Sequence, residues 1–355
     1  MTLAQFRNII KLYINFFIMA EANFTKKNVL VTGGAGFIGS HLSERLLSDS
    51  NVICVDSFIN SNERNIDHLL KNPDFEFLRF DLNKPLDLES FKELERFKVK
   101  FQGVQEIYHL ACPTSAKNFD QFKIQTLDSN SLAAKNAMEL AKKYNSKVVH
   151  ASTSVVYGPK RPDKEKFVET DTGLTDQLSP RACYDEGKRF AETVCATYAD
   201  VHKLDVKIAR IFRTYGPRQR LFDGEMIPDF IVDALEGKDL VIYGDDTFKT
   251  SLTYVSDIVD GIIKLMRAPS GTGAVNLGSD QEWNLADIAA KIIQMTGSSS
   301  KIKFEPPLLF MTPLGLPDIA KARETLGWFP LMGIDDGLKQ SIDYTIAHKE
   351  LLGIA

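Results

Sequence analysis

The sequence has few cysteines, and none is arranged to bind a metal. Only four occur in 355 residues, and no two form a Cys-x-x-Cys pair. They are Cys54, Cys112, Cys183 and Cys195. Structural zinc sites and disulfide-rich folds depend on closely spaced cysteines, so we expect no metal centre and no disulfide. Reduced thiols are typical of a cytoplasmic protein, and we predict that location.

Long hydrophobic runs and an excess of charge of one sign are also missing. The apolar stretch Leu12–Ala20 is short and contains Asn15, so the sequence predicts no membrane-spanning helix and no membrane partner. The formal net charge is only -4, which gives no electrostatic basis for binding nucleic acid. The remaining composition is that of an ordinary globular protein.

Residues 1–26 stand apart as an N-terminal extension. Ala20 to Ala22 has the small-residue pattern of a signal-peptide cleavage site, but Arg7 and Lys11 are badly placed for a signal peptide. Secretion is therefore the less favoured interpretation. An additional amphipathic helix, or an upstream start ahead of a true beginning at Met19, is favoured instead.

From residue 27 onward, short apolar runs alternate with segments of helical spacing. This alternation is typical of parallel strands joined by crossover helices. The predicted strands are Asn28–Thr32, Val52–Asp56, Phe75–Asp81, Glu106–Ala111, Lys147–Ser152 and Val206–Phe212. The predicted helices are Ile38–Leu47, Leu127–Lys143 and Tyr184–Lys203. The pattern predicts the α/β class with a doubly wound parallel sheet of the Rossmann kind.

After Phe212, glycine and proline break the chain into shorter pieces. These pieces predict a smaller α/β domain that binds the substrate. The helical stretch Ser256–Met266 and the strand-like Ala274–Leu277 are expected to return to the main sheet, so the two domains interleave. The predicted division is 27–212 plus 250–281 for the larger domain and 213–249 plus 282–355 for the smaller one.

Residues 29–39 read Val-Leu-Val-Thr-Gly-Gly-Ala-Gly-Phe-Ile-Gly, which predicts a strand, a glycine-rich turn and a helix start. Gly33 permits the tight turn, Gly36 lets the backbone approach a pyrophosphate, and Gly39 lets the helix pack closely on the strand. The helix N-terminus offers free N–H groups and a partial positive charge to a diphosphate. A glycine-rich loop without a ligand is the alternative.

Asp56 ends the second predicted strand, at the distance where a carboxylate meets the adenosine ribose hydroxyls. A 2′-phosphate would be repelled by this charge, and Ser57 offers no compensating cation. The expected cofactor is therefore NAD rather than NADP. Asp81 ends the third predicted strand and is placed to cap the adenine, with a helix cap as its alternative role.

Tyr184 and Lys188 are four residues apart in a predicted helix, so their side chains lie on one face. A tyrosine with a pKa near 10 is a weak base at neutral pH, and lowering that pKa by about three units needs roughly 4 kcal/mol of differential stabilisation. Lys188 and a positively charged nicotinamide can together supply it. Thr153, just past a strand end, is placed to hydrogen-bond the same substrate hydroxyl. The three residues are the predicted catalytic set; for Tyr184 and Lys188, surface pairing on a helix is the alternative.

The segment around these residues resembles a known family. Pro180–Arg189 reads Pro-Arg-Ala-Cys-Tyr-Asp-Glu-Gly-Lys-Arg, which is similar to the matching segment of the UDP-glucuronate decarboxylases, extended short-chain dehydrogenases that make UDP-xylose. The likeness runs from about residue 27 to the C-terminus. Further matching segments are His109–Pro113, Ala209–Phe212, Tyr254–Asp257, Asn276–Gly278 and Pro317–Ile319. The resemblance implies bound NAD, a UDP-linked sugar substrate and a homodimer built from the helices predicted at 127–143 and 184–203.

The two halves of the expected site follow from the same resemblance. The expected cofactor contacts are Gly33, Gly36, Phe37, Ile38, Gly39, Asp56, Asp81, Leu82, Leu110, Ala111, Tyr184 and Lys188. The expected substrate contacts are Pro113, Ser154, Val155, Arg213, Arg218, Arg220, Tyr243 and Lys249. The basic residues among them have an exposed, solvated surface as their alternative role.

Several positions depart from the decarboxylase pattern. Val155 stands where the decarboxylases carry glutamate, Arg213 replaces an asparagine, and Thr250 replaces an arginine. The 4,6-dehydratases also need an acid at the first position, whereas 4-epimerases use a small or apolar residue, and Tyr215–Arg220 looks more like the epimerases. Decarboxylation of UDP-glucuronate, which the resemblance implies, is the leading hypothesis. Val155 does not exclude it, because β-keto acids can lose carbon dioxide without a nearby acid. A UDP-hexose 4-epimerase is the alternative, and a catalytically silent NAD-binding regulator is a further one.

Overall fold

The computed structural model describes residues 26–114, 119–307, 313–349 and 353. The predicted N-terminal extension, 1–26, lies outside the described residues except for Lys26. Within the described ranges, no helix is long and apolar enough to cross a membrane.

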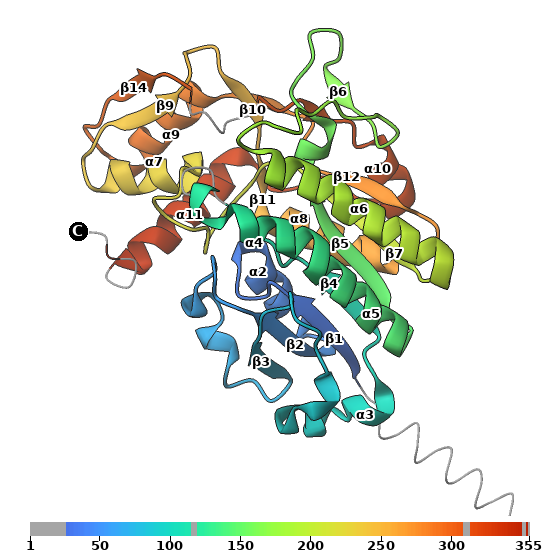
Figure 1. Ribbon diagram of the computed structural model, residues 1–355. Coiled ribbons are helices and arrows are strands. Elements are labelled where there is room, and N and C mark those ends of the chain that lie inside the picture. Colours follow the sequence, from blue (N-terminus) through green and yellow to red (C-terminus); the bar gives the residue numbers. More distant parts are fainter. Residues whose placement is uncertain (1–25, 115–118, 308–312, 350–352, 354–355) are drawn as a thin grey trace, which may run out of the picture.

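The larger part of the molecule is built on one seven-stranded parallel sheet (Figure 1). Its strands are β1 (Lys27–Thr32), β2 (Ser50–Asp56), β3 (Phe75–Arg79), β4 (Glu106–His109), β5 (Lys147–Thr153), β7 (Val206–Ile211) and β12 (Ala274–Leu277). They follow one another across the sheet in the order β3-β2-β1-β4-β5-β7-β12. The predicted doubly wound α/β class is confirmed. Because the winding reverses between β1 and β4, ligands are expected outside the carboxyl ends of these two strands.

Alternate residues of β1 belong to hydrophobic cores on opposite faces of the sheet. Val29 and Val31 lie in one core and Leu30 in the other, and all three are fully buried. Burial on both faces explains why this strand is a continuous apolar run rather than an alternating one. The first core is covered by α2 (Phe37–Leu46) and α8 (Val255–Arg267), and the second by α5 (Ala134–Tyr144) and α6 (Ala182–His202).

The helix predicted at Leu127–Lys143 is not continuous. A π-helical turn, Ser129–Ala133, separates α4 (Lys123–Asp128) from α5. Within this turn Asn130 Nδ2 donates a hydrogen bond to Cys112 Sγ at 3.3 Å. Single widened turns occur mostly at functional sites. This one borders the cavity described below, and helical spacing alone gives no sign of it.

Shorter elements form the second part of the molecule. They are α7 (Met226–Leu235), β9 (Leu240–Tyr243), β10 (Lys249–Ser251), β13 (Glu282–Asn284), α9 (Leu285–Thr296), β14 (Ile302–Glu305) and α11 (Ile334–Ala347). β9 pairs with β14 in parallel, and β10 pairs with β13 antiparallel. The predicted larger domain resumes at residue 250, which lies inside β10. We propose instead that this domain limit falls at the end of that strand.

The chain leaves the main sheet after β7 and returns to it with α8 and β12 (Figure 1). Short parallel pairs join the segments where it does so. They are β8 (Thr214–Tyr215) with β11 (Thr253–Tyr254), and β6 (Lys166–Phe167) with β15 (Leu316–Pro317). The remaining helices are α3 (Val99–Gln102), α10 (Ala320–Leu326) and 3-10 turns at 63–65, 67–69, 88–90, 92–97, 119–122 and 154–157.

Candidate active site

A cavity of about 1320 Å³ opens at the carboxyl ends of the strands. Segments that follow β1, β2, β4, β5 and β7 line it, together with residues 218–226 of the second part. Drug-sized ligands occupy about 300–1,000 Å³, so the cavity has room for two nucleotide-sized ligands. The predicted residues that line it are Gly33, Gly36, Phe37, Ile38, Gly39, Asp56, Asp81, Leu82, Leu110, Ala111, Pro113, Thr153, Ser154, Val155, Tyr184, Lys188, Arg213, Arg218 and Arg220.

The glycine-rich turn after β1 forms a cradle that larger residues would fill. Gly33 has a φ of +71°, and a Cβ there would lie 2.8 Å from the backbone of Leu110 and Ala111. A Cβ on Gly39 would lie 2.1 Å from the carbonyl oxygen of Gly33. Gly36 begins α2 without a side-chain cap, so no side chain covers the first N–H groups of the helix. These features fit a diphosphate at the helix N-terminus.

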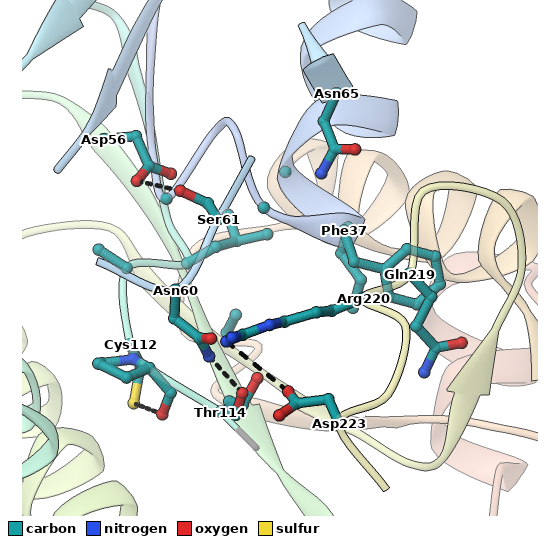
Figure 2. A pocket seen from close by; sticks show the side chains of 18 of the residues that line it. Phe37, Asp56, Asn60, Ser61, Asn65, Cys112, Thr114, Gln219, Arg220 and Asp223 are labelled. Atoms are coloured by element: carbon teal, nitrogen blue, oxygen red, sulfur yellow. Dashed lines mark hydrogen bonds and ion pairs between the residues drawn. The ribbon is translucent and has the colours of Figure 1, made fainter. Parts of the chain in front are cut away.

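Asp56 ties the cradle to the loop after β2. Its Oδ2 accepts a hydrogen bond from the N–H of Ala35 at 3.1 Å, and its Oδ1 accepts from Phe58 N at 2.9 Å and Ser61 Oγ at 2.7 Å. Figure 2 shows the contact with Ser61 beside the cavity. An ionised carboxylate has about four acceptor positions, so these three bonds leave one for a ribose hydroxyl. The predicted ribose contact therefore fits the geometry.

Asp81 lies in a loop rather than in a strand, because β3 ends at Arg79. Its Oδ1 accepts a hydrogen bond from the N–H of Asn83 at 3.0 Å and so stabilises a turn. Asp81 also lines the cavity, next to Leu82. A contact with adenine stays a prediction.

Tyr184 and Lys188 lie on the same face of α6 and both line the cavity. Only 8% of Tyr184 and 4% of Lys188 is exposed. Lys188 Nζ donates a hydrogen bond to the carbonyl oxygen of Ala151 at 2.9 Å, which holds the ammonium against β5. The Thr153 side chain hydrogen-bonds Tyr184. The structure thus brings the three predicted catalytic side chains together, and the surface-pair alternative does not fit their burial.

The charge state of Tyr184 depends on two opposing effects. Burial raises the pKa of the phenol above its ordinary value, whereas the nearby Arg181 cation and the hydrogen bond from Thr153 lower it. The Arg181 guanidinium carbon lies 5.0 Å from the centroid of the Tyr184 ring. Arg181 was not predicted as a site residue, although its spacing of three residues from Tyr184 places it on the same helical face.

Apolar side chains pack against Tyr184. Val155 is 3% exposed and packs with Tyr184, and Cys112 and Leu314 pack against this pair. Ser154 is also buried, at 4% exposed. The position where the decarboxylases carry glutamate is therefore a desolvated, uncharged surface in this protein.

Side chains of opposite charge also line the cavity. Arg213 and Glu225 interact electrostatically: burial lowers the pKa of Arg213 and raises that of Glu225, and each partner opposes the shift of the other. Arg220 reaches across the cavity in Figure 2, with Nη1 at 4.0 Å from Asp223 Oδ2. Glu225 and Asp223 were not predicted, and no spacing pattern in the sequence identifies them.

Arg218 lies in the cavity wall, but its guanidinium is engaged elsewhere. Nη2 donates to Glu44 Oε2 of α2 at 2.5 Å and lies 3.3 Å from His68 Nε2. The His41 ring in the same helix is hydrogen-bonded to the carbonyl oxygen of Pro217 at 2.9 Å. These contacts join the loop that begins at Pro217 to the helix of the glycine-rich cradle. Arg218 therefore also holds this loop, and its contact with the substrate stays a prediction.

Tyr243 and Lys249 are not brought to the cavity wall. Tyr243 ends β9, which pairs with β14 in the second part. Lys249 lies in β10, and its Nζ is 3.7 Å from Glu282 Oε2. Strand pairing within the second part holds both residues away from the cavity wall, and their contact with the substrate stays a prediction.

Loop residues that the sequence analysis missed close one side of the cavity. Asn60 donates from Nδ2 to the carbonyl oxygen of Thr114, and Asn65 donates from Nδ2 to that of Ala35 at 3.0 Å. Figure 2 shows these side chains on the side of the cavity formed by the loop after β2. Contacts of this kind join loops that are distant in sequence, so no local motif reveals them.

The fold and the cofactor cradle together define a Rossmann enzyme of the kind that binds a dinucleotide. The model of the NAD dependent epimerase/dehydratase family matches residues 29–278, and the chain belongs to this family.

Named relatives and a solved structure extend this finding. The chain is 38% identical over 320 residues to UDP-glucuronic acid decarboxylase 1 of Xenopus tropicalis, covering 90% of this chain and 72% of the relative. It is 35% identical over 326 residues to UDP-glucuronic acid decarboxylase 3 of Arabidopsis thaliana, covering 90% of each. The structure of UDP-glucuronic acid 4-epimerase from Bacillus cereus, in complex with UDP-glucuronic acid and NAD, superposes with a TM-score of 0.77 at 28% identity, covering 90% of this chain and 99% of that one.

Proposed function

We propose that this protein converts UDP-glucuronate to UDP-xylose and carbon dioxide, with NAD as cofactor. The observation that carries the proposal is the set of Thr153 and the buried Tyr184 and Lys188 at the wall of a cavity large enough for two nucleotides. The relatives named UDP-glucuronic acid decarboxylase, at 35% and 38% identity over 90% of the chain, support this substrate and product.

The chain's own residues fit NAD. The glycine cradle and the start of α2 fit the diphosphate, and Asp56 has one acceptor position for a ribose hydroxyl. When bound, NAD accepts a hydride from C4 of the sugar and returns it at the end of the cycle.

Tyr184 takes the proton of the C4 hydroxyl, and Thr153 orients that hydroxyl. Lys188, held by Ala151, and Arg181 both stabilise the phenolate form of Tyr184 by their positive charge. Loss of the proton and the hydride leaves a ketone at C4. The carboxylate on C5 is then β to this ketone.

Carbon dioxide leaves when the bond between C5 and C6 breaks and its electron pair enters an enolate. C5 then takes up a proton, and the ketone at C4 is reduced while Tyr184 returns the proton to the oxygen. One UDP-glucuronate and one proton thus give one UDP-xylose and one carbon dioxide. Val155, Cys112 and Leu314 form an apolar wall beside Tyr184, which keeps water from this side of the site.

A nucleotide-sugar 4-epimerase is the second candidate. It shares the oxidation at C4 but turns the ketone over before it is reduced. The specific observation in its favour is Val155, since 4-epimerases use a small or apolar residue at this position and Val155 is buried against Tyr184.

Proton NMR of the purified protein with a panel of nucleotide sugars separates the two candidates. The proposal predicts that UDP-glucuronate disappears and a UDP-pentose appears. Exchange between gluco and galacto configurations without loss of carbon would replace the proposal with the epimerase.

We also propose a cytoplasmic homodimer. The four cysteines are unpaired, which agrees with a reducing compartment. Apolar side chains are exposed along α4 and α6, which pack on one another: Ile124 is 66%, Leu127 44% and Phe190 52% exposed. A second copy of the chain that covers these side chains would remove them from water.

A further inference from the structure

Arg181 lies immediately before α6 and lines the cavity. It precedes Tyr184 by three residues and Lys188 by seven, so the three side chains follow one face of the helix. The Arg181 guanidinium carbon lies 5.0 Å from the centroid of the Tyr184 ring, and Lys188 Nζ lies 6.0 Å from the same centroid. The phenol therefore has one cation a turn before it and another a turn after it.

The two cations have different neighbours. Lys188 is bound to the carbonyl oxygen of Ala151 at 2.9 Å, against the main sheet. Arg181 acts electrostatically on Arg213 and Glu225, and its positive charge lowers the pKa of both groups. Arg213 and Glu225 line the cavity from the chain segment that follows β7, whereas the glycine cradle follows β1. Arg181 is thus the cation on the substrate side of Tyr184.

The guanidinium of Arg181 has a defined orientation. Nε donates to Asp185 Oδ1 at 2.9 Å, one helical turn further on. The side chains of Arg181 and Asp185 are only 20% and 13% exposed. An arginine oriented in this way presents a planar set of N–H donors, whose geometry matches a carboxylate.

The chemistry of a uronate brings its charge to this place. The C4 hydroxyl has to reach Tyr184 and Thr153 for the proton to be removed. The carboxylate is attached to C5, the carbon next to C4, so it lies beside the phenol. On one side of it Val155 and Leu314 offer only apolar surface.

We infer that Arg181 recognises the carboxylate on C5 and selects a uronate over a neutral hexose or pentose. The inference rests on the proposed function, since it names the residue that reads the acidic group of that substrate. Arg181 is a specificity-determining residue in this role. Asp185 is a positioning residue that orients the guanidinium.

The test compares the affinities of three ligands that share the uridine diphosphate and differ at C5. They are UDP-glucuronate, UDP-glucose and UDP-xylose. The NAD-loaded Tyr184→Phe protein is used so that no turnover occurs. Ligand affinities are measured by calorimetry in this protein and in double variants that also carry Arg181→Gln or Arg181→Lys. Arg220→Gln is the matched control, because Arg220 lines the same cavity but pairs with Asp223.

Arg181→Gln is expected to weaken the binding of UDP-glucuronate by about 10- to 100-fold and to change the affinity for UDP-xylose by less than about threefold. Arg181→Lys is expected to keep part of the preference for UDP-glucuronate. Arg220→Gln is expected to change the affinities for all three ligands alike. Unchanged binding of UDP-xylose also shows that the variant is folded. Equal loss for all three ligands, as for a diphosphate contact, or no loss at all would overturn the inference.

The proposed function is tested separately in the same protein. If the native enzyme released no carbon dioxide but still preferred UDP-glucuronate through Arg181, decarboxylation would be wrong and the carboxylate contact would stand. If carbon dioxide were released while Arg181→Gln left the preference unchanged, only the role of Arg181 would be wrong.

Discussion

Lys188 Nζ lies 6.0 Å from the centroid of the Tyr184 ring. Its hydrogen bond to the carbonyl oxygen of Ala151 keeps the ammonium in this place, and both side chains are buried. Burial alone raises the pKa of the Tyr184 phenol, so its use as a base depends on the positive charges around it. In the proposed mechanism, the basicity of this buried phenol therefore depends on the charges around it.

Replacement of Tyr184 by phenylalanine removes the proton acceptor and keeps the ring. We expect turnover of UDP-glucuronate to fall by about 10²- to 10⁴-fold, with the fold unchanged. Steady-state assays measure the fall. Tyr198→Phe is the matched control, because Tyr198 lies on the same helix and its hydroxyl bonds to the exposed Glu139 instead. An unchanged activity or cellular role in Tyr184→Phe would favour a catalytically silent regulator.

The pH dependence of the reaction is expected to shift when Arg181 is changed. The basic form of Tyr184 is negatively charged, and the Arg181 cation stabilises it and lowers its pKa. Arg181→Gln removes that cation, so the pKa rises and the ascending limb of kcat against pH moves to higher pH. Arg181→Lys keeps the charge and should restore most of the profile. Identical ascending limbs in the native and Gln proteins, at saturating substrate, would contradict this coupling.

Val155 provides a test of the decarboxylation step. It packs on Tyr184 in an apolar cluster, at the position where the decarboxylases carry glutamate. Val155→Glu places a proton donor beside C5, so we expect carbon dioxide release to increase relative to the native protein. Val155→Gln has the same size and no acidic proton, and is expected not to increase it. Equal rates in the two variants would show that an acid at this position is not limiting.

The ion pair between Arg218 and Glu44 is expected to slow the release of NAD. It joins the loop that begins at Pro217 to the helix that starts at the cradle. Exposed pairs contribute about 0.2–1 kcal/mol, so Glu44→Gln should speed NAD release by about 1.4- to fivefold. Stopped-flow displacement measures that rate. Asp260→Asn, which breaks the exposed 2.9 Å pair with Lys264 on α8, should leave it unchanged. A rate that responds equally to both variants would rule out a specific role for the loop.

The exposed apolar residues of α4 and α6 predict the subunit interface. Phe190→Arg puts a charge on this surface, and burying it in a dimer would be costly. We expect the native protein to be a dimer and Phe190→Arg to be largely a monomer in light scattering after size exclusion. Leu331→Arg changes a residue that is 75% exposed and lies outside both helices, so it should remain a dimer. A native monomer would overturn the proposed assembly.

The parts of the fold that depend on local spacing were accessible from sequence. The buried run Val29–Val31 and the glycines after it define a strand and a turn without reference to distant residues. The spacing of Tyr184 and Lys188 likewise places them on one face.

Features that depend on distant contacts were not accessible. The ion pair of Arg218 was not predicted, because its partner Glu44 lies 174 positions away in the sequence. The π-helical turn at Ser129–Ala133 and the charge of Glu225 in the cavity likewise follow from tertiary packing. Arg181 was missed for a different reason: its spacing from Tyr184 was readable, but only the structure shows that its guanidinium faces the cavity and the phenol.

The fate of the carboxylate carbon tests the central claim most directly. UDP-glucuronate labelled with ¹³C at C6 is incubated with the purified protein and NAD, and the label is followed by ¹³C NMR. The proposed mechanism predicts that the label appears as carbon dioxide and bicarbonate while unlabelled UDP-xylose accumulates, and that Tyr184→Phe abolishes both signals. Label retained in a UDP-uronate of inverted C4 configuration would contradict decarboxylation and identify a 4-epimerase.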